Sequence, residues 1–304
     1  MRKLLILLIP LLLVTACSIP LEPRPTATVS PPEPLPTEPP LFTNTPIVTP
    51  YPTAGGDTVH RYLFLGGDYR ESRAGTRYGD KTDVMLLVQV SYNREADNPA
   101  RIEVIQFPRN FYTEVEAMDD MWLFHVWGRE GWPGLHYYFQ QVFDVDLNGI
   151  FYVNMDRFVI FIDEIAPSGI MSDLGYLGGE DLLAYLRDND NNWGCPEYDC
   201  GDRQMRTLLH IAEHIKGMIK DAPFSIFGLW EDLGWLFETD LTTLEQIEQG
   251  GHIAIDLIGR NYQVNVHKMT EADGVVYNDT ELNARGWVIA EGGDLPAWIQ
   301  SILR

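Results

Sequence analysis

The fold is decided by the stretch Arg61–Asn110, which reads RYLFLGGDYR ESRAGTRYGD KTDVMLLVQV SYNREADNPA RIEVIQFPRN. It contains three short apolar runs, Tyr62–Leu65, Val84–Val90 and Ile102–Phe107. The runs are rich in leucine or β-branched residues and are bounded by Gly, Pro and Asn. Runs of this length and composition predict β-strands. We therefore expect three strands that lie in one sheet.

Polar residues stand at the ends of these predicted strands. Asp68 follows the first strand, Asp83 opens the second and Arg109 follows the third. Adjacent strand ends lie about 5 Å apart, so the three side chains are expected to meet at one rim of the sheet. Two carboxylates beside an arginine suit a divalent cation and a phosphate group. The alternative is that both aspartates cap turns and that Arg109 pairs with one of them.

The charge balance limits the class of partner. The chain has 22 Lys+Arg against 44 Asp+Glu, and its formal net charge of -22 argues against nucleic acid, because a phosphate backbone needs a basic footprint. A phosphate site must therefore gather its cations locally. The loop 69–82 does so, with the basic residues Arg70, Arg73, Arg77 and Lys81. Such a loop fits a phosphate ligand, and a solvated surface loop is the alternative.

The N-terminus predicts export. Two basic residues precede the apolar run Leu4–Val14, which is too short to be a good membrane-spanning helix. The run ends in VTAC, which resembles the bacterial lipobox with Cys17 as the lipid-modified residue. We expect residues 1–17 to be a lipoprotein signal peptide and the protein to be extracytoplasmic and lipid-anchored to the bacterial cell membrane. An uncleaved anchor and a plain signal peptide are the alternatives.

The rest of the chain divides into a tether and a domain. Residues 18–56 are dense in Pro and Thr, and they hold too few apolar groups to offset the entropy of ordering. We expect a disordered tether there and one extracytoplasmic domain at 57–304. Within the domain, Cys195 and Cys200 predict a local disulfide in an oxidising compartment. A metal pair is the alternative, although no second cysteine pair completes a zinc site.

Other segments show helix or strand patterns. The aromatic-rich segment 121–145 predicts a thick core or a wall for a long apolar ligand. Asp156 is expected to N-cap a helix that stops at Pro167. The remaining expected elements are strands at 149–154 and 262–267 and helices at 179–187, 202–220, 225–237, 241–249 and from Asp294.

The predicted helix from Asp202 carries a polar stripe. At about 100° per residue, one face gathers Arg203, Arg206, His210 and His214, and the opposite face is apolar. Two arginines in a first helical turn oppose the helix dipole, and a bound anion would explain them.

Five motifs in this order resemble the LytR-CpsA-Psr family of bacterial envelope proteins, over about residues 60–250. Three of them are strand ends, LFLGGD at 63–68, KTDVM at 81–85 and FPRN at 107–110. They resemble the family's first strand with its Asp, its Arg-Ser-Asp-Thr-Met motif and its Ile-Pro-Arg-Asp motif. The other two are DLLAYLR at 181–187 and RQMR at 203–206, similar to the family's Ala-Leu-Ala-Tyr-x-Arg and Arg-x-x-Arg-Gln segments.

The resemblance implies both a fold and a function. The family consists of α/β proteins, three-layer α/β/α sandwiches on a central mixed sheet, with an apolar pocket for a polyprenyl tail. Its members transfer a glycopolymer from a polyprenyl-pyrophosphate carrier to a cell-wall or envelope acceptor.

Carried over residue by residue, the resemblance assigns a catalytic and binding set. Asp68 and Asp83 would hold Mg²⁺. The pyrophosphate would be bound by the basic residues Lys81, Arg109, Arg187, Arg203 and Arg206. Asp83, Arg109 and Arg187 would be catalytic, and the chemistry would be largely electrostatic.

Four departures from the family pattern bear on activity. Lys81 replaces an arginine, which loses the bidentate fork. The other three are Asn110 for the acid after Pro-Arg, Asn189 for a second arginine and Thr207 for a glutamine. The alternative function is therefore a catalytically degenerate envelope lipoprotein that binds lipid-linked glycan or wall polymer.

A rival from another class is a zinc peptidase. His210, Glu213 and His214 match the pattern His-x-x-Glu-His, in which two histidines one turn apart bind zinc beside a glutamate. The same stripe carries Arg203 and Arg206, whose charge would oppose the metal, and the sequence marks no third ligand. This function is much less favoured than glycopolymer transfer.

Overall fold

The computed structural model describes residues 57–69, 81–93, 99–116, 118, 122–187, 197–221, 232–242, 245, 249, 262–279 and 286–304. The predicted signal peptide with Cys17, the tether at 18–56 and the side chains of Cys195 and Cys200 lie outside this set. The lipid anchor, the tether and the disulfide therefore stay predictions. None of the described helices is long and apolar enough to cross a membrane.

A mixed sheet of six strands forms the centre of the domain, in the order β7-β4-β1-β2-β3-β8. The strands β1 and β4 are parallel, as are β3 and β8, and the other neighbours are antiparallel. The five predicted strands are confirmed, because each predicted segment lies inside an observed strand to within one residue, and the short edge strand β7 was not predicted. The bounds are β1 (Asp57–Gly67), β2 (Thr82–Asn93), β3 (Ala100–Gln106), β4 (Gly149–Asn154), β7 (Glu238–Thr239) and β8 (Tyr262–Lys268).

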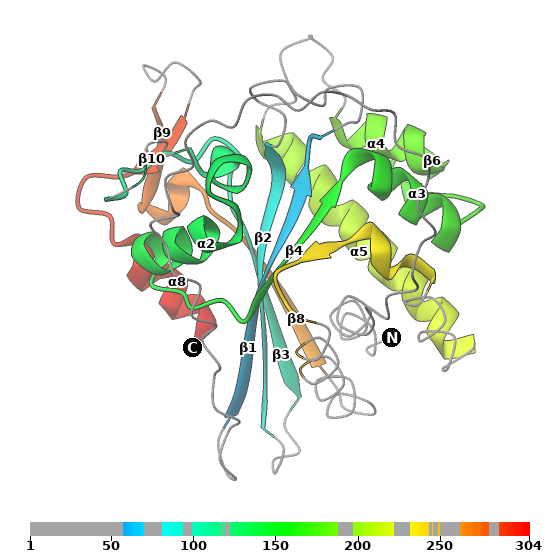
Figure 1. The fold of residues 1–304 in the computed structure, drawn as a ribbon, viewed down its shortest axis with the longest axis horizontal. Coiled ribbons are helices and arrows are strands. Elements are labelled where there is room, and N and C mark those ends of the chain that lie inside the picture. Colours follow the sequence, from blue (N-terminus) through cyan, green and yellow to red (C-terminus); the bar gives the residue numbers. More distant parts are fainter. Residues whose placement is uncertain are drawn as a thin grey trace, which may run out of the picture.

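Helices cover both faces of this sheet (Figure 1). One face carries α2 (Leu123–Phe143) and α8 (Leu295–Leu303). The other face carries α3 (Met155–Ile165), α4 (Gly179–Arg187) and α5 (Glu197–Asp221). The predicted three-layer α/β/α sandwich is therefore confirmed.

Two separate cores result from the alternation of strand side chains. In β1, Leu63 and Leu65 point to the core under α2 and α8, whereas Tyr62 points to the core under α3, α4 and α5. In β2, Met85 and Leu87 again belong to the first core. Successive strand residues point to opposite faces, so a strand covered on both faces is apolar throughout. This explains why the predicted strands are continuous apolar runs.

The aromatic segment forms the core under α2, as the simpler of the two alternatives predicted. Phe124, Tyr138, Phe139 and Phe143 are buried there. The helix is kinked at Gly131, whose φ of 62° lies in the left-handed region that favours glycine. Pro133 follows this kink and begins the second helical part, where its missing N–H costs nothing.

Two predicted helix starts are wrong. The side chain of Asn154, not of Asp156, accepts the backbone N–H of Arg157 at 2.9 Å and caps α3. The helix α5 begins at Glu197 rather than at Asp202, so Arg203 and Arg206 lie beyond its first turn. Their charges do not oppose the helix dipole, which falls off within that turn. The helix dipole therefore gives no reason to expect a bound anion beside these two arginines.

Several short elements were not predicted. They are β5 (Ile170–Ser172), β6 (Gly175–Leu177), η3 (Gly234–Leu236), η4 (Glu271–Asp273), β9 (Val276–Asp279) and β10 (Gly286–Ile289). Strands of two to four residues carry too little periodicity to be recognised. The terminal helix is confirmed, since Asp294 caps α8 through the N–H of Ala297 at 2.9 Å. Most of the predicted helices at 225–237 and 241–249 lies outside the described residues.

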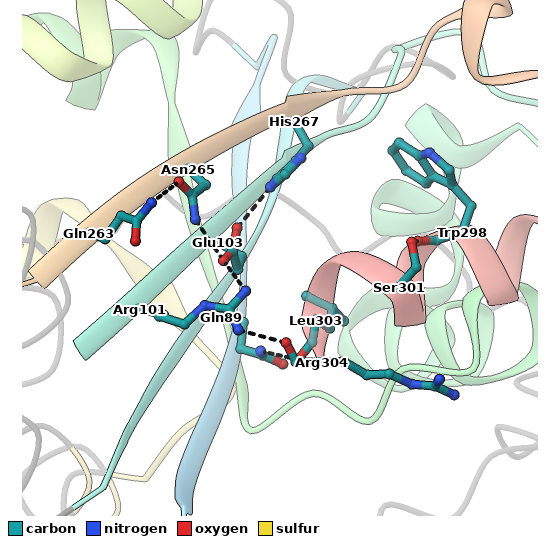
Figure 2. Close-up of polar contacts among 10 residues, drawn as sticks. All are labelled: Gln89, Arg101, Glu103, Gln263, Asn265, His267, Trp298, Ser301, Leu303 and Arg304. Carbon is teal, nitrogen blue, oxygen red and sulfur yellow. Dashed lines mark hydrogen bonds and ion pairs between the residues drawn. The ribbon is translucent and has the colours of Figure 1, made fainter. Parts of the chain in front are cut away.

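A buried glutamate joins the edge strand β8 to the sheet (Figure 2). Glu103 in β3 is 2% exposed, and its carboxylate contacts Arg101, Asn265 and His267 at 2.8 Å each. Burial by itself raises the pKa of Glu103, but the hydrogen bonds from His267, Asn265 and Arg101 outweigh it and leave the pKa below its ordinary value. The ionised carboxylate is therefore the stable form in the folded protein.

The same polar cluster holds the last turn of α8 (Figure 2). The side chain of Gln89 donates to the carbonyl oxygen of Leu303 at 2.7 Å, and Arg101 donates to that of Arg304 at 2.7 Å. The last carbonyl groups of a helix lack helical partners, so these side chains supply them. The C-terminal helix is thereby fixed to β2 and β3.

We predict that Gly179→Ala destabilises the domain by about 1–3 kcal/mol, which is the usual cost of overpacking. A Cβ on Gly179 would lie 2.4 Å from the carbonyl oxygen of Val159, so α3 and α4 would have to separate. Denaturant unfolding measures the effect. Gly178→Ala is the matched control, because its nearest neighbour would be Asp163 Oδ1 at 3.4 Å. Equal losses in both variants would contradict the prediction.

We also predict that Glu103→Gln lowers the free energy of unfolding at neutral pH by about 1–3 kcal/mol, because a charged acceptor of three hydrogen bonds is lost. The lowered pKa of Glu103 stabilises the fold above the pKa of the unfolded state, and this contribution disappears as pH falls through the folded pKa. Urea unfolding between about pH 7 and pH 3 should therefore give a shallower pH dependence for the variant than for the wild type. Glu180→Gln, at an exposed position of α4, should leave the slope unchanged.

Candidate functional site

The sheet topology brings the chemically interesting residues to one rim. The strands β1, β3, β4 and β8 end at this rim, and β2 begins there because it is antiparallel to β1 and β3. Gly67, the last residue of β1, lies opposite both Thr82 and Asn154. The adjacent residues Asp68 and Asp83 are thus neighbours, as the strand ends predicted.

Asp83 is the centre of the rim. Its Oδ1 forms an ion pair with Arg109 Nε at 3.0 Å, and its Oδ2 accepts a hydrogen bond from Arg187 Nη1 at 2.5 Å. Arg187 also contacts Met155 Sδ at 3.3 Å. The predicted convergence of Asp83 and Arg109 is confirmed. The pairing of Arg109 with an aspartate is also what the simpler alternative predicted.

Asp68 lies in a less favourable electrostatic environment. Its backbone N–H donates to the carbonyl oxygen of Lys81 at 2.8 Å, and its Oδ1 accepts the N–H of Lys81 at 3.2 Å. Burial raises the pKa of Asp68, and the charge of Asp83 raises it further. The hydrogen bond from Lys81 and the charges of Arg109 and Arg187 act in the opposite direction without cancelling this rise. A cation near both carboxylates would relieve the repulsion.

Two cations of the rim lie over the ring of Phe124. The distances to the ring centroid are 5.2 Å from Lys81 Nζ and 5.5 Å from Arg109 Cζ. The ring face attracts positive charge and helps to hold both cations at the rim. Phe124 is a member of the site that the sequence did not single out, because it comes from α2, distant in the chain.

Arg203 and Arg206 flank Tyr185 at the side of this rim. Arg203 donates to the carbonyl oxygen of Tyr185 at 3.0 Å and lies 5.5 Å from the centroid of its ring. Arg206 pairs with Asp173 at 2.9 Å, and the hydroxyl of Tyr185 donates to the same oxygen of Asp173 at 2.9 Å. Tyr185 and Asp173 were not predicted as site residues. Both arginines are thereby connected to α4, which carries Arg187 two residues beyond Tyr185.

The helix α5 approaches the rim closely because it has a glycine there. A Cβ on Gly201 would lie 3.1 Å from Gln106 Oε1 and 3.3 Å from the side chain of Lys268. Lys268 in turn donates to Asp202 at 3.0 Å. The ends of β3 and β8 therefore position the beginning of α5 and, through it, Arg203.

The residues that depart from the family pattern do not all lie at the rim. Lys81 is at the rim, whereas Thr207 is 2% exposed and lies in the packed face of α5. The backbone carbonyl of Asn110 accepts the N–H of Trp287 at 2.7 Å. Asn189 and the loop arginines Arg70, Arg73 and Arg77 lie outside the described residues.

The predicted zinc pattern is described only in part, because the side chain of Glu213 lies outside the described residues. The ring of His214 contacts the carbonyl oxygen of Ile165 at 2.8 Å, which connects α5 to the end of α3. Among the residues that the structure describes, no group of three His, Cys, Asp or Glu side chains is arranged to hold a metal ion.

Comparison with known proteins gives similarity at the level of structure. No family model and no curated protein matches the sequence. TagV of Bacillus subtilis superposes with a TM-score of 0.56 and 16% identity, over 81% of this chain and 97% of that one. TagT bound to LI-WTA gives 0.54 and 17%, over 81% and 90%. The ywtF protein of Bacillus subtilis gives 0.55 and 16%, over 82% and 91%.

TagT and TagV are LytR-CpsA-Psr proteins. The chain has the LytR-CpsA-Psr fold. The resemblance that the five motifs indicated is thus confirmed for the architecture, at an identity of 15–17%. The LytR-CpsA-Psr fold accounts for the mixed sheet and for the position of the motif residues Asp68, Asp83 and Arg109 at one rim. The roles of the individual site residues in this chain are proposals.

We predict that Asp83→Asn lowers the pKa of Asp68 toward its ordinary value, because the negative charge that helps to raise it is removed. A carbon-13 NMR titration of the Asp68 carboxyl measures this change. Asp173→Asn is the control, since Asp173 lies on the β5–β6 turn and pairs with Arg206 instead. An Asp68 pKa that stays the same or rises in Asp83→Asn would show that the two carboxylates do not interact.

Proposed function

We propose that this protein transfers a glycopolymer from a polyprenyl-pyrophosphate carrier to a cell-wall or envelope acceptor. The observation that carries the proposal is the Asp83 carboxylate held between Arg109 and Arg187 beside the buried Asp68. This rim concentrates positive charge in a strongly acidic chain. The structural neighbour TagT, solved in complex with LI-WTA, supports a lipid-linked wall polymer as the class of substrate.

The arginines are suited to bind the two phosphate groups of the carrier. A guanidinium presents several N–H donors in a planar fork that matches phosphate oxygens. Arg109 and Arg187 approach Asp83 from opposite oxygens of its carboxylate, so their charges already converge on one region. Lys81 adds a third positive charge over Phe124. We assign the pyrophosphate to these three cations, with Arg203 supporting it from α5.

The two aspartates fit a magnesium ion. Hard divalent cations prefer carboxylate oxygens. Asp83 Oδ1 is buried and accepts no hydrogen bond from the described residues, since its contact with Arg109 is an ion pair only. The pKa of Asp68 is raised by burial and by Asp83, and this electrostatic cost is what a cation would remove. We therefore propose that Asp68 and Asp83 hold Mg²⁺, which would neutralise phosphate charge.

The contribution of the chain to the reaction is electrostatic and positional. Charge grows on the leaving phosphate as its bond to the transferred sugar phosphate breaks. Arg109 and Arg187 would neutralise that charge from close to their present positions, because Asp83 already directs both of them at one region. Asp83, Arg109 and Arg187 are therefore the proposed catalytic residues.

The proposed location follows from the same substrate. A polyprenyl carrier resides in the membrane, so the protein should work there, and a lipid at Cys17 with the tether at 18–56 would keep it there. The glycopolymer and its acceptor would lie outside the cytoplasm. A lipid-anchored, extracytoplasmic transferase is the function that agrees with the predicted export signal and the observed fold.

The test is phosphate release from polyprenyl pyrophosphate in the presence of Mg²⁺. We expect Arg109→Ala and Arg187→Ala each to reduce the rate ~100-fold to 1,000-fold, as losing one preorganised charge donor does. Removal of Mg²⁺ with a chelator should abolish release. The control is Arg129→Ala, an exposed arginine of α2 that should keep the wild-type rate.

The outcomes separate the two functions. Tight binding of the carrier without phosphate release would favour the degenerate binding protein, and Asn110→Asp with Asn189→Arg would then test whether the departures from the family pattern are the cause. Neither binding nor release would leave only the fold in common with the structural neighbours and would overturn the proposal.

A further inference from the structure

The hairpin of β5 and β6 has an inner and an outer face. Its strands pair with Met171 opposite Tyr176 and with Ile170 opposite Leu177. Ile170 is 1% exposed and belongs to the core under α3, α4 and α5, against which Leu177 also packs. Since successive strand residues alternate between faces, Met171 and Tyr176 share the outer face.

This outer face is apolar although it is exposed. The exposed fractions are 41% for Met171, 65% for Tyr176 and 74% for Leu174 in the turn between the strands. A solvent-facing strand surface is normally polar. Single exposed apolar residues are common on soluble proteins, but three on one short hairpin form a patch that indicates an interaction.

Hydrogen bonds hold the turn in place. Ser172 Oγ accepts the N–H of Leu174 at 3.1 Å and donates to the carbonyl oxygen of Gly175 at 2.8 Å. Gly175 has a φ of 103°, a conformation that favours glycine. At the same turn, the carboxylate of Asp173 accepts the hydroxyl of Tyr185 and pairs with Arg206. These hydrogen bonds therefore fix the conformation of the turn in which the side chain of Leu174 is exposed.

We propose that the tip of the β5–β6 hairpin inserts into the surface of a lipid bilayer. A single acyl or prenyl chain would need a concave site, whereas Leu174 lies in an exposed turn. Tyrosine is favoured at the boundary between lipid and water, which suits Tyr176. Arg206 is already paired with Asp173 at this turn, so the contact with lipid would rest on the apolar side chains rather than on charge. The inference rests on the proposed function only in placing the domain beside a membrane.

Insertion would fix the orientation, relative to the membrane, of the rim that carries Asp83 and Arg187. Tyr185 contacts Asp173 of the hairpin and lies two residues before Arg187, which pairs with Asp83. A hairpin tip in the head-group layer would therefore keep this rim close to the depth at which the phosphates of a lipid-linked carrier lie. Because the chain is strongly acidic, simple charge attraction would disfavour binding, and the apolar tip would have to supply the contact.

The experiment uses the full chain reconstituted in vesicles of phosphatidylcholine and phosphatidylglycerol. A photoreactive benzoylphenylalanine replaces Leu174 in one protein and Trp235 in another, and lipid adducts are measured by mass spectrometry. Trp235 is the matched control, because it is 61% exposed and lies in η3, outside the hairpin. We expect ~10-fold more lipid adduct at position 174, as a membrane-inserted apolar residue requires. High salt should not remove the difference. Equal yields at both positions would overturn the proposal.

A second variant separates this inference from the proposed function. Leu174→Asp should reduce phosphate release from the long-chain carrier in vesicles ~10-fold and leave release from a short, water-soluble prenyl pyrophosphate within about twofold. Adducts at position 174 without cleavage of either substrate would support the bilayer contact and contradict the transferase. Cleavage of both substrates at wild-type rates in Leu174→Asp would contradict the bilayer contact alone.

Discussion

The carboxylate of Asp83 is the group on which the arrangement of the rim depends. It stands at the beginning of a central strand and contacts one arginine from the loop after β3 and another from the end of α4. Arginine side chains are long and flexible, so a fixed partner is needed to keep both of them directed at the same region. The sheet and the helical layer are thereby joined through one charged side chain. A ligand at this rim would find its binding cations in place, and it would have to compete with Asp83 for them.

Because the chain is acidic, an anion can be attracted only where several cations are held close together. Exposed cations in a protein with twice as many acidic as basic residues are screened and outnumbered at long range. The arginines of the rim act only where carboxylates, an aromatic ring and the helix α5 hold them close together. A multiply charged anion gains most from such a cluster, because each of its oxygens can meet a different donor.

Much of the fold and part of the site could be predicted from the sequence, for identifiable physical reasons. Apolar runs such as Val84–Val90 exceed the length of a turn and show strand composition, and the direction of neighbouring strands then places Asp68 and Asp83 together. Phe124, Tyr185 and Asp173 could not be predicted, because they reach the site only through tertiary packing. The start of α5 was missed because its first turns contain Cys200 and Gly201, which are poor helix formers. The same reasoning explains how the fold is shared with proteins of 15–17% identity, since pattern and strand ends suffice to specify it.

The polar cluster at Glu103 has a consequence for the order in which the domain assembles. The strands β1, β2 and β3 follow one another as an antiparallel meander, so their pairing needs only contacts that are close in the sequence. The contact between Glu103 and His267 joins residues that are 164 positions apart in the chain. The contact between Gln89 and Leu303 joins residues that are 214 positions apart. An apolar segment packed in place of β8 or α8 would leave the carboxylate of Glu103 or the amide of Gln89 buried without these partners, which is costly. The polar contacts of this core are thus complete only when the last helix of the chain is in place.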